Sequence, residues 1–341
     1  MGGEVITLQF GNASNYVGSH YFNVREEAYH RASSDTECAK DVAFDRAFRL
    51  RESKGGMTYV PRLVLVDRRG SLGSTSLSFL SGESGGAPDT AKMAAEAMWT
   101  EDRVEVERSP APPKSTFVRY LEDRAEGSSG TTSELPDLRK LDDEVGQWTD
   151  FSAITFHPRS IHQLHRFQHD IHDFLDESDA RSVLGRVEEG DELLDRIRYF
   201  AEDCDGLQGF QILVDTADAF QFLARDTLED LQDDYGKKEF LTMGVGCNEL
   251  AEDKRKQRQQ LLNHALSLCN LSQTAGLHMP TRMGRWSKIA KTTLRPELLF
   301  HTSAVLAGVL DGVSLPYLRA DHPLPMSVWQ RLLGRGPRGN I

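Results

Sequence analysis

The chain of 341 residues is long enough for one large domain or two ordinary ones, and 39% hydrophobic residues suffice to bury a core. A formal net charge of −12 repels a phosphate backbone, so we expect no nucleic-acid partner. Since no stretch approaches the roughly 20 apolar residues of a membrane helix, we also expect no transmembrane segment.

The four cysteines are widely spaced, at Cys38, Cys204, Cys247 and Cys269. Without a C-x-x-C pair, they predict neither a zinc ribbon nor a disulfide framework, and they favour a reducing compartment. The N-terminus lacks the basic start and apolar run of a signal peptide, and it lacks the Arg-rich character of a mitochondrial transit peptide. We therefore expect the protein in the cytoplasm.

The first elements are predicted as strand, small-residue loop and helix. Residues 5–10 alternate and are rich in β-branched side chains, which predicts a strand. Residues 11–15 are small and polar, as in a turn, and residues 16–30 have the apolar spacing of a helix. The free amides of such a loop, at the positive end of the helix dipole, suit a phosphate group. This order predicts the opening of a nucleotide-binding α/β domain.

A short apolar run at residues 63–66 predicts a buried parallel strand that ends at Asp67. An aspartate just past such a strand stands where open α/β sheets bind ligands. The alternative is a surface turn, where aspartate is common. Residues 81–88 form a Gly/Ser-rich loop, and prolines, glycines and serines over 109–149 predict a flexible linker or insertion.

The second half alternates helices with strands, which predicts a mostly parallel sheet. The expected helices cover 191–204, 218–235, 257–271 and 298–313, and the expected strands cover 210–214 and 240–245. In the helix over 257–271, the expected buried stripe consists of Leu261, Leu262, Ala265, Leu268 and Cys269.

Five histidines cluster between residues 157 and 172: His157, His162, His165, His169 and His172. If residues 159–173 form a helix, the last four lie close to one face and can share a metal ion. The alternative, which we favour, is a polar helix surface, because metal-like spacing alone has a high false-positive rate. We predict no metal site. We also predict no catalytic residue, since the chain has no nucleophile elbow, no Walker P-loop and no G-x-G-x-x-G after a strand.

Three segments, in the same order, resemble tubulin. Residues 11–18 (GNASNYVG) are similar to its first phosphate loop, G-Q-C-G-N-Q-I-G. Residues 59–67 (YVPRLVLVD) are similar to Y-V-P-R-A-I-L-V-D, and residues 204–211 (CDGLQGFQ) to C-D-C-L-Q-G-F-Q. The resemblance implies an α/β fold of the tubulin type, with a Rossmann-like GTPase-type parallel sheet flanked by helices.

Residues 150–160 (DFSAITFHPRS) resemble the hallmark segment of the Misato family, which tubulins lack, and residues 315–319 (LPYLR) also resemble that family. The Misato resemblance implies a role in mitochondrial distribution, morphology and fusion. For insect members it also implies roles in spindle microtubule assembly and in tubulin-folding complexes. The implied partners are the cytosolic face of mitochondria, tubulin, and chaperonin or prefoldin complexes. The implied location is cytoplasmic and peripheral on the mitochondrial outer membrane.

The resemblance also implies a nucleotide site that is only partly kept, with GTP as the candidate cofactor. Tubulin's glycine-rich G-G-G-T-G-S-G loop is replaced by DTADAFQ from residue 215, which places Asp215 and Asp218 where phosphate oxygens would lie. The second guanine-contacting asparagine of tubulin aligns with Leu299 and is lost. The residues that the resemblance assigns to a residual site are Gly11, Asn12, Asn15, Asp67 and Asn263. The alternative, favoured because the main phosphate loop is missing, is that these residues are structural.

We accordingly expect the first half of a tubulin-like domain at 1–108, the linker at 109–149, and the Misato segment with the second half at 150–319. Because family members continue well past Ile341, we expect 320–341 to begin a truncated second domain and the helix over 298–313 to expose an apolar patch. Three hypotheses remain open: a non-catalytic interaction protein, a GTP switch or GTPase, and a metal-dependent protein that uses the histidines.

Overall fold

Strand β1 (Val5–Phe10) lies near the middle of a seven-stranded sheet with the order β11-β8-β7-β6-β1-β4-β5, and every strand pair in it is parallel. The computed structural model describes residues 3–34, 43–53, 56–75, 80, 113–125, 137–246, 251–284, 288–289, 292–334 and 339–340. The other strands are β4 (Leu63–Arg69), β5 (Ile161–Gln168), β6 (Gly209–Asp215), β7 (Glu239–Gly246), β8 (Leu277–Arg282) and β11 (Gly339–Asn340).

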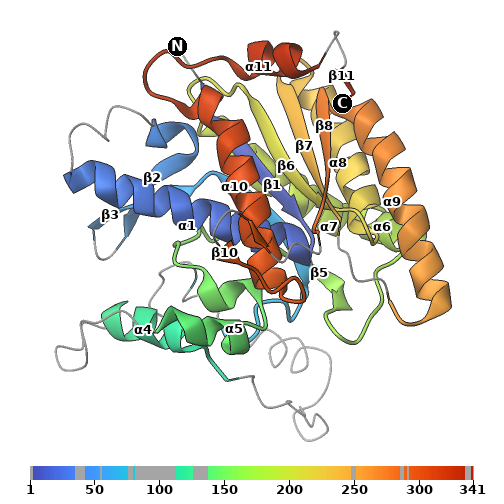
Figure 1. Cartoon of the computed structure of the whole chain (residues 1–341). Coiled ribbons are helices and arrows are strands. Elements are labelled where there is room, and N and C mark those ends of the chain that lie inside the picture. Colours follow the sequence, from blue (N-terminus) through green and yellow to red (C-terminus); the bar gives the residue numbers. More distant parts are fainter. Residues whose placement is uncertain are drawn as a thin grey trace, which may run out of the picture.

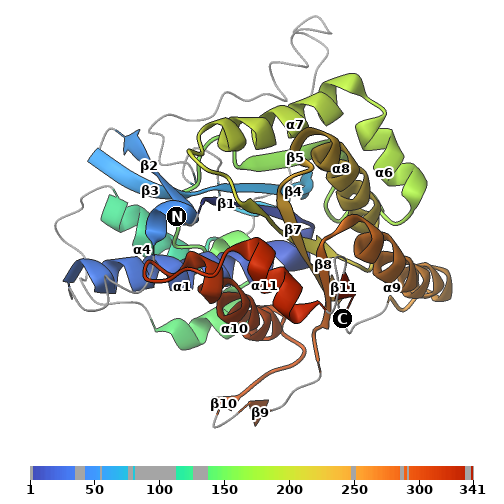
Figure 2. The ribbon, with the colours of Figure 1, turned by 90° about the horizontal axis from the view of Figure 1, so that it is seen from above.

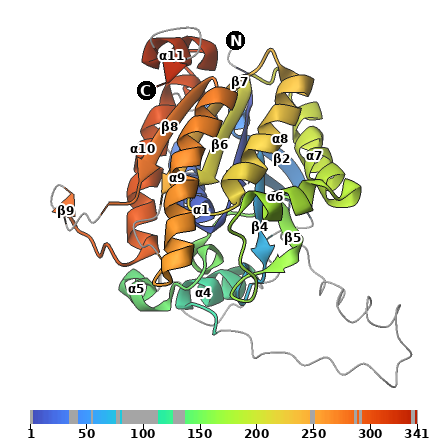
Figure 3. The same cartoon turned by 90° about the vertical axis from the view of Figure 1, so that its right-hand side faces the viewer.

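Helices cover both faces of this sheet (Figures 1 and 2). One face carries α1 (Asn12–Ser34) and α10 (Leu299–Leu318). The other carries α6 (Glu177–Leu184), α7 (Val187–Glu202), α8 (Phe220–Tyr235) and α9 (Lys254–Thr274), as Figure 3 shows from the side. Because both faces are covered, all residues of β1 and β6 are buried, as expected for central strands of a parallel sheet.

A hairpin of β2 (Phe48–Ser53) and β3 (Gly56–Pro61) lies outside the main sheet, beside the second half of α1, and follows a short 3-10 turn, η2 (Phe44–Arg46). Two very short strands, β9 (Lys288–Ile289) and β10 (Thr292–Thr293), pair with each other. The predicted α/β class with a parallel sheet is confirmed.

Helix α10 is tied to α1 by polar contacts inside the core. Arg25 is buried and forms an ion pair of 2.9 Å with Asp311, and it also donates to the Ser314 hydroxyl at 2.8 Å. Among the described residues, α10 is the one helix long and apolar enough to cross a membrane, with a mean hydropathy of 1.3 over its most apolar window. A core helix passes the same test, and these contacts are those of a core helix. Its outer side exposes Val309 and Leu315, as expected from the sequence.

The predicted linker is wrong over most of its described part. Residues 116–125 form α4, followed by a 3-10 turn, Leu138–Lys140, and by α5 (Leu141–Glu144). The Thr116 amide and hydroxyl both donate to Glu144 at 2.7 Å, which ties the start of α4 to the end of α5. The composition was misleading because its Gly/Ser-rich part, 127–133, lies outside the described residues, as does the loop at 81–88.

The end of the chain continues the same domain instead of starting a second one. Helix α11 (Met326–Leu333) buries Met326 completely, and the Met326 amide donates to Gln208 Oε1 at 3.1 Å. Strand β11 then pairs in parallel with β8, with Gly339 opposite Leu277. The start of a truncated second domain predicted at residue 320 is therefore not what the structure shows.

The predicted stripe of α9 is also wrong, because the helix is turned the other way. Leu261, Leu262 and Leu268 are 48–51% exposed, and Ala265 and Cys269 are exposed as well. The buried positions are Asn263, Ser267, Leu271 and Thr274, three of which are polar. Hydrogen bonds from Asn263 to the loops beneath it fix this orientation, which apolar spacing does not reveal.

Candidate functional site

The candidate site lies where β1 passes into α1, at the carboxyl edge of the parallel sheet. Gly11 turns the chain with a φ of 104°, a region that favours glycine, and its amide donates to the Val66 carbonyl at 3.0 Å. Helix α1 begins at the next residue, Asn12, so the predicted turn is shorter than expected. The first amides of a helix have no partner within the helix and carry its positive dipole end. This is the geometry of a phosphate-binding loop.

In this protein a carboxylate occupies that position. Asp215, the last residue of β6, accepts from the Ala13 amide at 2.9 Å through Oδ2. Its Oδ1 accepts from the Ser14 amide at 2.7 Å and from the Ser14 hydroxyl at 2.6 Å. A Cβ on Gly11 would lie 2.5 Å from Asp215 Cγ, so the glycine leaves the space that the carboxylate uses. The amides that would bind a phosphate are therefore already used.

Two further carboxylates make the site strongly acidic. Burial is the main cause that raises the pKa of Asp215, to about 7, against the lowering effect of the Ser14 hydrogen bonds. Burial and the nearby Asp215 raise the pKa of Asp218 well above its usual range, and burial also raises the pKa of Asp67. Arg68 acts in the opposite direction on both Asp67 and Asp218. A triphosphate would meet negative charge in a site of low dielectric, which is unfavourable.

Asp67 and Asn15 are in contact, as the resemblance to a nucleotide site implies. Asn15 Nδ2 donates to Asp67 Oδ2 at 2.8 Å, and the Arg68 amide donates to Asp67 Oδ1 at 2.8 Å. Both side chains are completely buried. Asp67 lies inside β4 and not just past its end. The buried Oδ1 atoms of Asn12 and Asn15 have no hydrogen-bond partner among the described residues.

Asn263 has a different environment from the other assigned residues. Its Nδ2 donates to the carbonyls of Leu175 at 2.7 Å and Ala217 at 3.0 Å, and its Oδ1 accepts from Gln259 at 3.1 Å. Both amide hydrogens are thus used to join α9 to the loops before α6 and after β6. This supports a structural role for Asn263.

The histidines do not form the predicted helix face. Residues 161–168 are strand β5, which pairs in parallel with β4, with Ile161 opposite Leu65. His162 is buried, and burial lowers its pKa to about 4, whereas His165 is exposed. Within the described parts of the chain, no group of three or more potential ligands could hold a metal ion. Apolar residues at 161, 164 and 167 imitate helical spacing, which explains the error.

Sequence reasoning missed two polar contacts of this region. One is Ser14, whose hydroxyl binds Asp215; a serine in the first turn of a helix that follows a glycine turn was the available signal. The other joins Thr216, just after β6, to His264 of α9, with 2.8 Å between Oγ1 and Nδ1. No sequence pattern indicates that second contact.

The parallel sheet, the Gly11 turn and the Asn15–Asp67 contact define a tubulin-like α/β protein. A family model described as "Tubulin domain" matches residues 136–318, and one described as "Misato Segment II tubulin-like domain" matches residues 3–123. The chain belongs to the Misato family of tubulin-like proteins.

Curated relatives agree with this assignment. The chain is 31% identical over 361 residues to "Protein misato homolog 1" of Bos taurus, covering 95% of this chain and 61% of the relative. It is 32% identical over 363 residues to the Homo sapiens protein of that name, with the same two coverages. It is 28% identical over 346 residues to "Protein DML1" of Phaeosphaeria nodorum, covering 99% and 61%. The chain thus spans about three fifths of the length of these relatives.

Proposed function

We propose that this chain is a non-catalytic member of its family, and that its tubulin-like domain serves as a binding platform in mitochondrion organisation. The observation that carries the non-catalytic part is the Asp215 carboxylate on the first amides of α1. GTP hydrolysis requires phosphates that are held and neutralised, and here those donors are used by a carboxylate. The mitochondrial part rests on membership of the Misato family. The proposal includes a peripheral location on the cytosolic face of the outer membrane.

The same platform is proposed to contact tubulin, or chaperonin and prefoldin complexes, during spindle microtubule assembly. The second candidate function is a GTP switch or GTPase with a divergent tubulin-type site. The buried Asn15–Asp67 contact favours this second candidate, because it keeps two of the assigned residues in place.

Calorimetric titration of the purified protein with GTP and magnesium distinguishes the two candidates. We expect no saturable heat at millimolar nucleotide, because the phosphate position is filled and acidic. Circular dichroism must first show that the sample is folded. Tight binding that is lost in an Asp67→Ala, Asn263→Ala double variant would establish the GTP switch and overturn the non-catalytic proposal. Because Asn263 joins three segments, the unfolding free energy of that variant is measured alongside.

The mitochondrial role predicts a phenotype in cells. We expect depletion of the protein to disturb mitochondrial distribution, and the full-length protein with Asp67→Asn to restore it as well as the wild type does. Asparagine keeps the shape of the side chain while removing the charge that a magnesium ion would need. Fluorescence microscopy of mitochondrial networks provides the measurement. Normal networks after depletion would contradict the mitochondrial role, and failure of the variant to rescue would favour the switch.

A further inference from the structure

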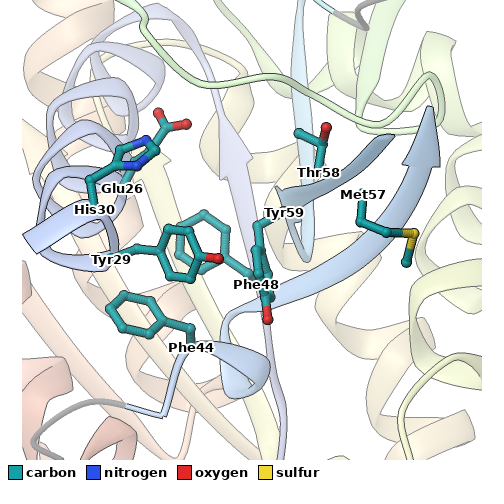
Figure 4. A pocket seen from close by; sticks show the side chains of 8 residues that line it. All are labelled: Glu26, Tyr29, His30, Phe44, Phe48, Met57, Thr58 and Tyr59. Carbon is teal, nitrogen blue, oxygen red and sulfur yellow. The ribbon is translucent and has the colours of Figure 1, made fainter. Parts of the chain in front are cut away.

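A second site is present on the other half of α1. A pocket of about 250 Å³ lies between α1, the short turn η2 and the hairpin of β2 and β3. It is lined by Glu26, Tyr29, His30, Phe44, Phe48, Met57, Thr58 and Tyr59 (Figure 4). At 1.5 Å per helical residue, Glu26 is about 20 Å along α1 from Asn12, so this pocket is separate from the acidic phosphate-site remnant.

Aromatic rings form much of the wall of the pocket. The Tyr29 ring lies 5.0 Å from Phe44 at 80° and 4.7 Å from Tyr59 at 54°, measured between centroids. Phe48 is supported from behind by Phe22, in an edge-to-face contact at 5.7 Å. The rings are inclined to one another and not stacked, and Figure 4 shows them gathered on one side of the pocket. Ring faces carry partial negative charge and attract cations within about 6 Å.

Glu26 adds a full negative charge to this aromatic setting. Figure 4 shows Glu26 and His30 together on α1, across the pocket from Thr58 and Met57 of β3. No ion pair to Glu26 is present among the described residues. Burial raises the pKa of Glu26 to about 7, and Arg124 of α4 opposes that rise. A cation in the pocket would favour the ionised carboxylate, which burial alone disfavours.

We propose that this pocket binds an alkylammonium group of the size of a lysine side-chain terminus or its methylated form. Aromatic walls with one carboxylate are the chemistry that recognises such cations. An anion would meet Glu26 and the net charge of −12. The volume is below the roughly 300–1,000 Å³ of pockets for drug-sized ligands, which fits one small group. The proposal is independent of nucleotide binding at Asp215.

The test compares choline with 3,3-dimethylbutan-1-ol, its uncharged carbon analogue, by saturation-transfer NMR and calorimetry on the full chain. We expect choline to bind at least about tenfold more tightly than the neutral analogue. Equal affinity for the two, or no binding of choline, would overturn the proposal. A parallel titration with lysine and with Nε-trimethyllysine shows which of these forms the pocket prefers.

Matched variants locate the binding. Glu26→Gln keeps the shape and removes the charge, and we expect it to weaken choline binding about tenfold. Glu27→Gln is the control, since its side chain is 60% exposed, is not part of the pocket lining and pairs with Arg31. If both variants weaken binding equally, or if Glu26→Gln has no effect, the pocket is not the site. Thermal unfolding of each variant confirms that the fold is kept.

Discussion

Replacing Asp215 with asparagine is expected to cost about 2–3 kcal/mol more unfolding free energy at pH 5 than at pH 8. The pKa of Asp215 in the folded protein is about 7, above the ordinary value of 3.8, with burial as the main cause. Between these two values the folded state holds a proton that the unfolded state has released. The stability linked to that proton is fully present below pH 3.8 and is lost as the pH rises through 7. Asparagine cannot take up a proton, so the variant lacks this contribution.

The measurement is urea unfolding of wild type and variant at both pH values, and the quantity of interest is the change in their difference. The difference is needed because burial lowers the pKa of several histidines, including His20 and His278, to about 4. Those histidines reduce the stability of both proteins at pH 5, and their effect cancels in the difference. Asp205→Asn, at an exposed position, controls for the loss of one charge. A difference that does not vary with pH would show that Asp215 is ionised throughout.

The Asp215 arrangement keeps the physics of a phosphate loop while removing its ligand. A free helix N-terminus needs an acceptor, and three donors from Ala13 and Ser14 converge on one side chain of the chain itself. This contact joins β6 to the start of α1 in the absence of any nucleotide. A domain that requires no ligand to complete this corner is suited to a permanent binding platform.

Sequence alone predicted the parts of the fold in which local pattern and tertiary position agree. The continuous apolar run at residues 63–66 and the strand before Asp215 are fully buried, and such strands are recognisable without knowing their neighbours. The loss of the phosphate-loop glycines was visible as well, because glycine, unlike aspartate, has no Cβ to block a ligand. The placement of Asp215 near the phosphate position followed from that comparison.

The remaining errors arise where tertiary contacts override local spacing. Residues 161–168 have helix-like apolar spacing, but pairing with β4 makes them a strand. Helix α9 turns its leucines outward because Asn263 must reach two carbonyls beneath it. The pocket beside Glu26 assembles residues from α1, η2, β2 and β3, and no spacing within one segment indicates such a site.

Gly11→Ala is expected to destabilise the protein by about 3 kcal/mol, for two separate reasons. The φ of 104° at this residue is strained for any residue with a Cβ, at a cost of about 1–2 kcal/mol. The new methyl group would also lie 2.5 Å from Asp215 Cγ, an overlap that costs about 1–3 kcal/mol. Urea unfolding at pH 7 measures the loss. Gly308→Ala in α10 is the control, because a Cβ there meets nothing within 4 Å and should be neutral or stabilising.

A double-mutant cycle separates the overlap from the backbone strain. In an Asp215→Gly background the side chain that the new methyl group would strike is absent, so Gly11→Ala should cost only the strain, about 1–2 kcal/mol. We therefore expect the double variant to be more stable than the sum of the two single losses, by about 1–3 kcal/mol. Strict additivity would mean that residue 11 and the carboxylate are not in contact, and the filled phosphate position would then lose its structural basis. A favourable coupling would show that glycine is required here by the carboxylate of the protein itself, with no nucleotide present.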